Sequence, residues 1–245
     1  MQIEGKHVLV TGASRGLGRA LTFAFANAGA TQVLAGTRKK EDGETLKAEA
    51  ERLGVNVTPV HLDVRSDEDV NAAAALGGID ILVNNAGVAG YGDPTTMDFN
   101  SIQEEIEVNY LGTLRMVRAF APAMIEQQEG AIVNIATAFA KINLPLIGTY
   151  CATKAALLSL GQALRAYLSP HGIFVMTVLP TTIDTDMSRG ADVPKMGTEF
   201  VAGEILEAVR EEKYDPPIGD EAHRVIEGVA KDAVGFEKML SQYRA

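Results

Sequence analysis

The sequence predicts an α/β fold in which helices cover both faces of a doubly wound, mostly parallel sheet. Short, nearly continuous apolar runs alternate with longer helical patterns along the chain, and a glycine-rich turn follows the first run. Continuous apolar runs are typical of strands buried on both faces, and their alternation with helices favours a parallel sheet. No repeat or linker interrupts this pattern, so we expect one domain over residues 1–245.

The expected strands are apolar runs bounded by glycine, proline or polar residues. In chain order they cover residues 7–10, 33–35, 55–62, 79–83, 131–135 and 173–179. Helical patterns cover residues 17–28, 41–53, 101–127 and 150–168, and a short alanine-rich helix is expected after Ser66. The pairs Ser66 with Asp69 and Ser101 with Glu104 have capping-box spacing, which predicts two helix starts.

After the last predicted strand the sequence predicts one loop, and the strand–helix pattern weakens beyond about Tyr214. Residues 184–200 are polar and contain glycine and proline, which predicts a mobile loop beside the substrate. Pro216 and Pro217 interrupt the pattern, and residues 221–245 predict one or two peripheral helices.

The chain is acidic, with 32 Asp and Glu against 22 Lys and Arg and a formal net charge of -10. Such a surface does not attract nucleic acid or anionic membranes, so we expect neither as a partner. The single cysteine, Cys151, excludes an intrachain disulfide, and the scattered histidines lack the spacing of metal ligands, so we expect no metal. No signal-peptide pattern or bilayer-spanning apolar stretch is present, which favours a cytoplasmic protein.

A glycine-rich turn joins the first strand to the first helix. Its glycines allow a tight turn and close approach of the backbone to a ligand, and the helix start offers free N–H groups to a phosphate. A plain glycine turn is the alternative, but the strand–turn–helix context favours dinucleotide binding on a Rossmann fold. The candidate residues are Gly12, Ser14, Arg15, Gly16, Leu17 and Gly18.

The end of the second strand indicates which dinucleotide binds. A site for NAD(H) usually has an acidic residue there, whereas this chain has no acid between Gly36 and Glu41. Arg38 at this point, with Arg15 from the glycine turn, can hold a 2′-phosphate by charge-assisted bonds. A solvated helix start is the alternative, and the missing acid favours NADP(H) over NAD(H).

Two further strand ends contribute to the expected cofactor site. Asp63 closes the third strand, where its carboxylate is either an acceptor for the adenine amino group or a local cap. The small residues that follow the fourth strand give the cofactor ribose a backbone wall, with a bare turn as the alternative. They are Asn85, Ala86 and Gly87, after Asn84.

Tyr150 and Lys154 lie at i and i+4 of a predicted helix, which places both side chains on one face. A free phenol has a pKa near ~10, and a nearby ammonium lowers it. The pair therefore suits acid–base work on a hydroxyl or carbonyl. By itself such a pair is usually two surface neighbours.

Together these motifs resemble those of the short-chain dehydrogenase/reductase family in its compact single-domain form. The resemblance covers residues 6–187 and implies a homodimer or homotetramer joined through the two long helices. The matching motifs, in order, are the glycine turn, Asp63, Asn84 to Gly87, Asn109 in Val-Asn-Tyr-Leu-Gly, and Tyr150 to Lys154.

The resemblance also implies catalytic roles. Tyr150 would exchange a proton with the substrate oxygen, and Lys154 would lower the pKa of Tyr150 and hold the nicotinamide ribose. Asn109 would support a water that carries protons between Lys154 and solvent. Thr137 stands where the family has a serine and keeps a hydroxyl that can donate to the substrate, although its methyl group crowds the pocket.

On the nicotinamide side, the family's Pro-Gly pair is here Pro180 followed by Thr181, whereas Ile183 and Thr185 match residues that face the carboxamide. Mainly apolar residues are expected near the substrate, while Arg189 and Lys195 leave an acidic substrate open. The expected pocket residues are Ala89, Gly90, Tyr91, Phe139, Leu144 and Met187.

The sequence therefore predicts an NADP(H)-dependent oxidoreductase that transfers a hydride between the nicotinamide and an apolar small-molecule carbonyl or secondary alcohol. The two departures, Thr137 and Thr181, leave one alternative open. In it, the chain is a catalytically weak nucleotide-binding or regulatory module on the same fold.

Overall fold

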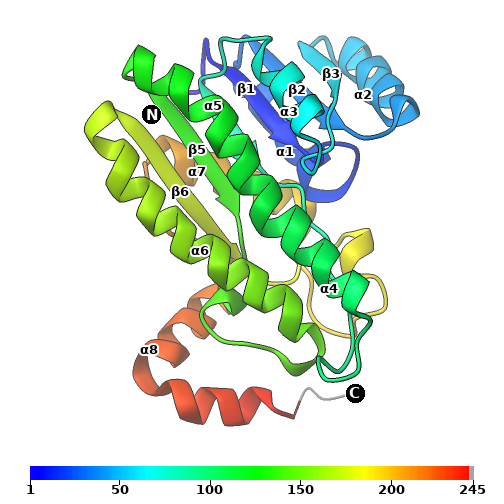
Figure 1. The fold of residues 1–245 in the computed structure, drawn as a ribbon, viewed down its shortest axis with the longest axis vertical. Coiled ribbons are helices and arrows are strands. Elements are labelled where there is room, and N and C mark those ends of the chain that lie inside the picture. Colours follow the sequence, from blue (N-terminus) through cyan, green and yellow to red (C-terminus); the bar gives the residue numbers. More distant parts are fainter. Residues whose placement is uncertain (243–245) are drawn as a thin grey trace.

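The strands of the central sheet all run parallel. Among residues 1–242, which the computed structural model describes, the sheet has seven strands in the order β3-β2-β1-β4-β5-β6-β7 (Figure 1). The chain order reverses between β1 and β4, and ligands bind at such a switch point, outside the carboxyl ends of the strands. The strands are β1 (His7–Thr11), β2 (Gln32–Thr37), β3 (Val57–His61), β4 (Ile81–Asn84), β5 (Gly130–Ile135), β6 (Ile173–Pro180) and β7 (Pro217–Ile218).

Helices cover both faces of the sheet. One face packs against α1 (Gly16–Asn27), α2 (Lys40–Leu53) and α7 (Thr198–Arg210). The other packs against α3 (Asp67–Ala74), α5 (Thr113–Gln127) and α6 (Gly148–Leu168). Neighbouring residues of one strand serve both cores, because Val8 and Val10 belong to the first and Leu9 to the second. Burial on both faces explains the continuous apolar runs.

The predicted fold class is confirmed, and a strand overlaps each predicted apolar run. The seventh strand, β7, lies where the two prolines predicted an interruption. It pairs with β6, and the Leu179 N–H donates to the Pro216 carbonyl at 2.9 Å. Proline lacks an N–H group and is tolerated here because β7 is an edge strand, which pairs with a neighbour on one side only.

The long helix predicted over residues 101–127 is divided into three parts. They are α4 (Phe99–Ile106), a π-helical turn (Glu107–Gly112) and α5. The capping box predicted at Ser101 is wrong, because the Asp98 carboxylate caps α4 by accepting the Ser101 N–H at 3.1 Å.

At Ser66 one half of the predicted box forms. The Ser66 hydroxyl accepts the Asp69 N–H at 3.1 Å, whereas the Asp69 carboxylate accepts from the Asp63 N–H at 2.9 Å instead of from Ser66.

The C-terminal part is more helical than predicted. Helix α7 was not predicted, and because it begins at Thr198, the last three residues of the expected 184–200 loop are helical. The end of the described chain forms α8 (Asp220–Leu240), with one non-helical residue at Asp232, along one end of the molecule (Figure 1). Residues 243–245 of the expected C-terminal segment lie outside the described residues. Of the helices described, none combines the length and apolar character needed to cross a membrane.

Candidate active site

The glycine turn after β1 opens α1 at the switch point of the sheet. Gly12 and Gly16 have φ angles of 65° and 54°, which strain residues other than glycine. A Cβ atom on Gly18 would lie 2.1 Å from the Gly12 carbonyl oxygen and 2.4 Å from Asn85 Nδ2. Glycine at these positions therefore lets the helix start approach both the turn and the end of β4.

Side-chain hydrogen bonds join the ends of β1 and β4. The N–H groups of Asn85 and Ala86 both donate to Thr11 Oγ1 at 3.0 Å, and Asn85 Nδ2 donates to the Thr11 carbonyl at 2.9 Å. These bonds hold the segment after β4, including Gly87, beside the glycine turn. Sequence reasoning missed Thr11, although a polar residue at the end of a buried strand is a usable signal.

The first turn of α1 suits an anion. Its N-cap residue, Arg15, makes no side-chain cap, and the turn contains no acidic residue. Free N–H groups and the helix dipole there favour a phosphate. Ser14 is half-buried in the turn, whereas the Leu17 side chain is buried in the core, so Leu17 offers only its backbone. The glycine cradle, which side chains would fill, fits the pyrophosphate of a dinucleotide.

Arg38 and Asp63 lie near each other at the ends of β2 and β3. The hydrogen bond from Arg65, at 2.6 Å, lowers the pKa of Asp63, and the charge of Arg38 acts in the same direction. Arg38 itself is exposed. The Asp63 carboxylate accepts from the Arg65 side chain and from the Arg65 N–H at 3.0 Å, whereas Ser66 is the residue that caps α3.

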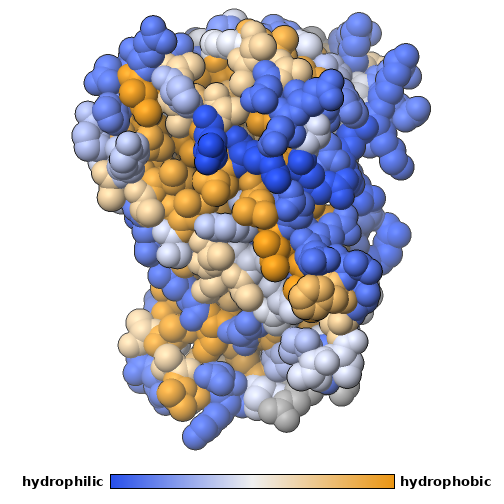
Figure 2. Space-filling view, in the orientation of Figure 1, coloured by the Kyte–Doolittle hydropathy of each residue, from blue (hydrophilic) through white to orange (hydrophobic). Residues whose placement is uncertain are grey.

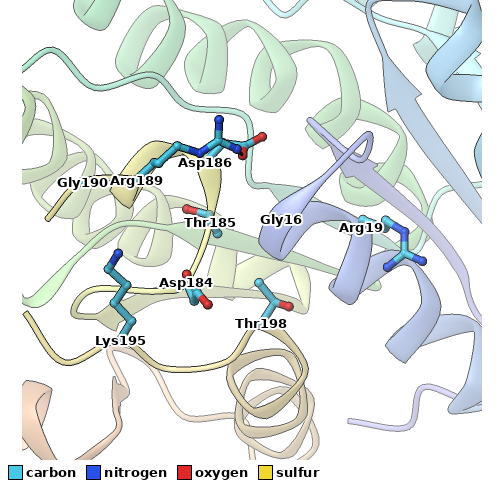
Figure 3. A pocket seen from close by; sticks show the side chains of 9 residues that line it. All are labelled: Gly16, Arg19, Asp184, Thr185, Asp186, Arg189, Gly190, Lys195 and Thr198. Carbon is cyan, nitrogen blue, oxygen red and sulfur yellow. Dashed lines mark hydrogen bonds and ion pairs between the residues drawn. The ribbon is translucent and has the colours of Figure 1, made fainter. Parts of the chain in front are cut away.

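A surface pocket of about 420 Å³ adjoins the glycine turn (Figure 3). A Cβ atom on Gly16 would lie 3.0 Å from Thr185 Cγ2, so the turn touches the segment after β6. Ile183 is half-buried in that segment, next to the hydrophobic core. The pocket is lined by Gly16, Arg19, Asp184, Thr185, Asp186, Arg189, Gly190, Lys195 and Thr198.

The structure brings Tyr150, Lys154, Asn109 and Gly87 together. Lys154 is 4% exposed, and its Nζ donates to the Ile135 carbonyl at 2.8 Å. A Cβ atom on Gly87 would lie 3.3 Å from Asn109 Oδ1 and 3.5 Å from Lys154 Nζ. The same Nζ lies 5.7 Å from the centre of the Tyr150 ring. The phenol and the ammonium therefore share one face of α6, beside the small residues that follow β4.

Asn109 lies in the π-helical turn and is fully buried. Its Oδ1 accepts the Val88 N–H at 2.9 Å, and its Nδ2 donates to the Val88 carbonyl at 2.9 Å and to Thr153 Oγ1 at 3.0 Å. Turns of π-helix are frequent at functional sites. Here the turn places an amide between the segment after β4 and helix α6.

Burial dominates the pKa values of the Tyr150–Lys154 pair. It raises the pKa of Tyr150 above its usual value, with smaller contributions from neighbouring groups that include Glu105. Burial also lowers the pKa of Lys154 to about 8. Burial, which raises the pKa, dominates at Tyr150, so the expected lowering of this pKa by Lys154 stays a prediction.

The Thr137 hydroxyl is engaged within the protein. It donates to the Pro180 carbonyl at 3.0 Å and accepts the Phe139 N–H at 3.3 Å. Thr181, next to Pro180, has a buried hydroxyl with no hydrogen-bond partner among the described residues. Thr137, which follows β5, therefore contacts the end of β6, and Thr181 directly follows that strand.

The predicted pocket residues after β4 and β6 also meet. Tyr91 Oη donates to the Met187 carbonyl at 2.7 Å, which joins the loop after β4 to the loop after β6. Behind the first of these loops, Glu105 Oε1 accepts the Gly90 N–H at 2.6 Å. Sequence reasoning missed Glu105, which is a buried carboxylate.

Known proteins share this architecture. The family model for short chain dehydrogenase matches residues 6–194. A solved short chain dehydrogenase from Burkholderia cenocepacia, in complex with NADP, is 38% identical with a TM-score of 0.90, and the match covers 98% of this chain and 99% of that one.

Two curated relatives have different stated activities. A 3-oxoacyl-[acyl-carrier-protein] reductase from Aquifex aeolicus is 35% identical over 197 residues, which are 77% of this chain and 78% of that protein. A D-erythrulose reductase from Gallus gallus is 36% identical over 192 residues, which are 77% of this chain and 76% of that protein.

Proposed function

The chain belongs to the short-chain dehydrogenase/reductase family of oxidoreductases, and on that basis we propose NADP(H)-dependent hydride transfer between the nicotinamide and a carbonyl or secondary alcohol. The observation that carries this proposal is the buried Lys154 beside Tyr150 and Gly87, next to the glycine turn. A phenol over such a site suits proton transfer to an oxygen, which must accompany hydride transfer to a carbonyl carbon.

We assign the cofactor to the switch-point cradle. Gly12, Gly16 and Gly18 would hold the pyrophosphate at the start of α1, with Ser14 and the Leu17 backbone beside it. Asp63 and the segment Asn85–Gly87 would contact adenine and ribose, and Pro180, Ile183 and Thr185 would flank the nicotinamide. When bound, NADP(H) supplies or accepts the hydride.

The 2′-phosphate would bind Arg38 and Arg15. Arg38 is exposed just after β2, and no acidic residue stands between Gly36 and Glu41 at the position where NAD(H) sites usually have one. The similar structure from Burkholderia cenocepacia contains NADP, which supports this choice over NAD(H).

Tyr150 would donate a proton to the carbonyl oxygen during reduction and accept it from the alcohol during oxidation. Its high pKa in the protein without cofactor keeps it protonated at neutral pH, as reduction requires. Lys154 would hold the ribose hydroxyls and stabilise the phenolate by its charge. Because Gly87 has no side chain, the ribose can approach Lys154 Nζ from that side.

Asn109 would support the proton path between Lys154 and solvent. Since both ends of its amide side chain are already bonded, a relay water would bind its backbone carbonyl, which accepts one bond from Thr113 Oγ1 at 3.1 Å and keeps a second lone pair.

We also propose that the chain assembles as a homodimer or homotetramer through α4, α5 and α6. The face that carries α5 and α6 shows hydrophobic residues among polar ones (Figure 2), and Ile106 at the end of α4 is exposed. Size-exclusion chromatography with light scattering tests this, and a monomer at micromolar concentration contradicts it.

The test of the reaction is spectrophotometric. NADPH and NADH oxidation are followed with ketones, aldehydes, quinones and steroids, and we expect turnover with NADPH that the Tyr150→Phe variant lacks although it still binds NADPH. Absence of turnover across the panel, with NADPH bound, favours the nucleotide-binding or regulatory alternative. Normal turnover in the Phe variant contradicts the role of Tyr150.

A further inference from the structure

Helix α4 buries a charge and exposes hydrophobic residues. Of its eight residues, all within the described part of the chain, Glu105 alone is buried, at 1% exposed, whereas Phe99 and Ile106 are exposed. An amphipathic helix ordinarily does the reverse. A buried carboxylate costs folding free energy unless donors satisfy it, so its presence here indicates a role beyond folding.

The Glu105 carboxylate lies against the loop that follows β4. Its Oε1 accepts the Gly90 N–H at 2.6 Å. A Cβ atom on Gly90 would lie 3.3 Å from this oxygen and 1.9 Å from Met97 Cε. Met97 Sδ in turn accepts from Thr149 Oγ1 at 3.4 Å, one residue before Tyr150. The carboxylate therefore lies against the predicted pocket loop, and Met97 connects this loop to the first turn of α6.

One carboxylate oxygen is left without a donor. Oε2 of Glu105 is buried and has no hydrogen-bond partner among the described residues. A carboxylate oxygen accepts up to two hydrogen bonds. For a buried acceptor that makes none, the free-energy cost of desolvation is not compensated. Burial is the main cause of the raised pKa of Tyr150, and the charge of Glu105 is a small further contribution in the same direction.

We propose, on the basis of the carbonyl reduction proposed above, that Glu105 determines substrate specificity by accepting a hydrogen bond from a substrate hydroxyl at Oε2. The substrates are then hydroxylated carbonyl compounds and the corresponding diols. The pocket segment next to the carboxylate is Ala89–Gly90, whose side chains are a methyl group and a hydrogen. Met97 Cε fills the space beside Gly90, so a ligand that reaches Oε2 must displace the flexible end of that side chain. A neutral hydroxyl is favoured over an ammonium because Lys154 already places a cation in the site.

Pairs of ketones with the same shape test this recognition. Hydroxyacetone is compared with butan-2-one, and 4-hydroxybutan-2-one with pentan-2-one, in NADPH-dependent reduction. We expect kcat/KM for the better hydroxyketone to exceed that of its apolar counterpart by at least about tenfold, because a site built for a hydroxyl rejects the analogue without it. Glu105→Leu should reduce this ratio at least about fivefold, and Glu105→Gln should retain part of it, since an amide oxygen still accepts.

Glu104→Gln is the matched control. Glu104 is the preceding residue of α4, is exposed and pairs with Arg65 at 3.4 Å, so the ratio should not change. Equal losses on both ketones of a pair in Glu105→Leu, or an unchanged ratio, overturn the proposal and leave Glu105 as a support for Gly90. Aminoacetone reduced in preference to hydroxyacetone overturns the choice of a hydroxyl.

A second measurement needs no turnover. Protein saturated with NADP⁺ is melted with propane-1,2-diol or with butan-2-ol. The diol should raise the Tm of the wild type more than the Tm of Glu105→Leu, whereas butan-2-ol should shift the Tm of both proteins equally. If no carbonyl is reduced, the proposed function fails, while this measurement still decides about Glu105. Equal Tm shifts in both proteins overturn its role. The unliganded Tm of each variant reports whether it is folded.

Discussion

Arg15 in the glycine turn and Asp186 in the segment after β6 form an ion pair at 3.0 Å, so two segments remote in sequence meet beside the predicted cofactor site. Asp186 also pairs with Arg189 (Figure 3). Arg15 is one of the two cations proposed for the 2′-phosphate, and in this structure its guanidinium is bound to the Asp186 carboxylate. Both side chains are largely exposed, so the pair contributes about 0.2 to 1 kcal/mol, which a phosphate can exceed.

Asp186→Asn should therefore strengthen NADPH binding. Removing the competing carboxylate frees Arg15, and the energy of an exposed pair corresponds to a decrease in Kd of about 1.5- to 5-fold. Fluorescence titration with NADPH measures it. Asp192→Asn, an exposed acid of the same loop, is the control and should leave Kd unchanged. Weaker binding by Asp186→Asn would mean that Asp186 orients Arg15 instead of competing for it.

Arg38→Asp should shift the preference from NADPH toward NADH. The variant loses charge-assisted bonds to the 2′-phosphate, worth about 1.5 to 3 kcal/mol, so KM for NADPH should rise by at least about tenfold. The new carboxylate can accept the ribose hydroxyl of NADH. Steady-state kinetics with both cofactors measure the ratio. Lys39→Asp, the next residue along, controls for loss of charge alone, and a selectivity unchanged by Arg38→Asp removes Arg38 from the site.

Most of the fold could be predicted because its signals are local. All the predicted strands except β3 have nearly continuous apolar runs, and the glycine turn is recognisable from its place between a strand and a helix. The cap of α4 was missed because Asp98 and Ser101 are both good cap residues, three positions apart, and local sequence does not rank them. Helix α7 was not predicted although its apolar residues recur at helical spacing; its N-cap residue, Gly197, has no side chain that could mark the helix start.

Less of the site could be predicted, because it depends on how helices are rotated. Glu105 belongs to a stretch rich in acids, and nothing local distinguishes it from the exposed Glu104. Which of the two is buried follows from the packing of α4 onto α6 and from the π-helical turn that separates α4 from α5. The bond from Thr137 to Pro180 likewise joins residues remote in sequence, and a motif at Thr137 cannot reveal it.

Lys154→Met should make the protein more stable while removing activity. Burial lowers the pKa of Lys154 from 10.5 to about 8, so its charge opposes folding at neutral pH. This shift corresponds to about 3 kcal/mol, reduced by about 1 kcal/mol because the Ile135 carbonyl loses its donor. Urea denaturation at pH 7 measures the gain. Lys141→Met, at an exposed position, is the control and should change little.

The lowered pKa of Lys154 also predicts how the difference in unfolding free energy between the wild type and Lys154→Met depends on pH. Between about pH 8 and 10.5 the unfolded chain holds the Lys154 proton more firmly than the folded chain does, so the unfolding free energy of the wild type rises with pH relative to Lys154→Met. The difference between the two proteins should be largest below pH 8 and shrink above it. A difference independent of pH would mean that Lys154 is as easily charged in the folded protein as in water.

Thr137→Ser should raise kcat. In the structure the Thr137 hydroxyl donates its proton to the Pro180 carbonyl, so it must turn from that bond before it can donate to a substrate oxygen. The β-branched threonine is held near one χ1 rotamer, and serine is freer to rotate. We expect a gain of about two- to tenfold in kcat with NADPH, and Thr137→Val, which keeps the shape but has no hydroxyl, should lose at least about tenfold.

Because Thr137→Val also leaves the Pro180 carbonyl and the Phe139 N–H without a partner, its Tm must be measured alongside its kinetics. If serine and valine both leave kcat unchanged, the hydroxyl serves only to join η2 (Ala138–Ala140) to the end of β6, and the substrate oxygen takes its hydrogen bond from Tyr150 alone.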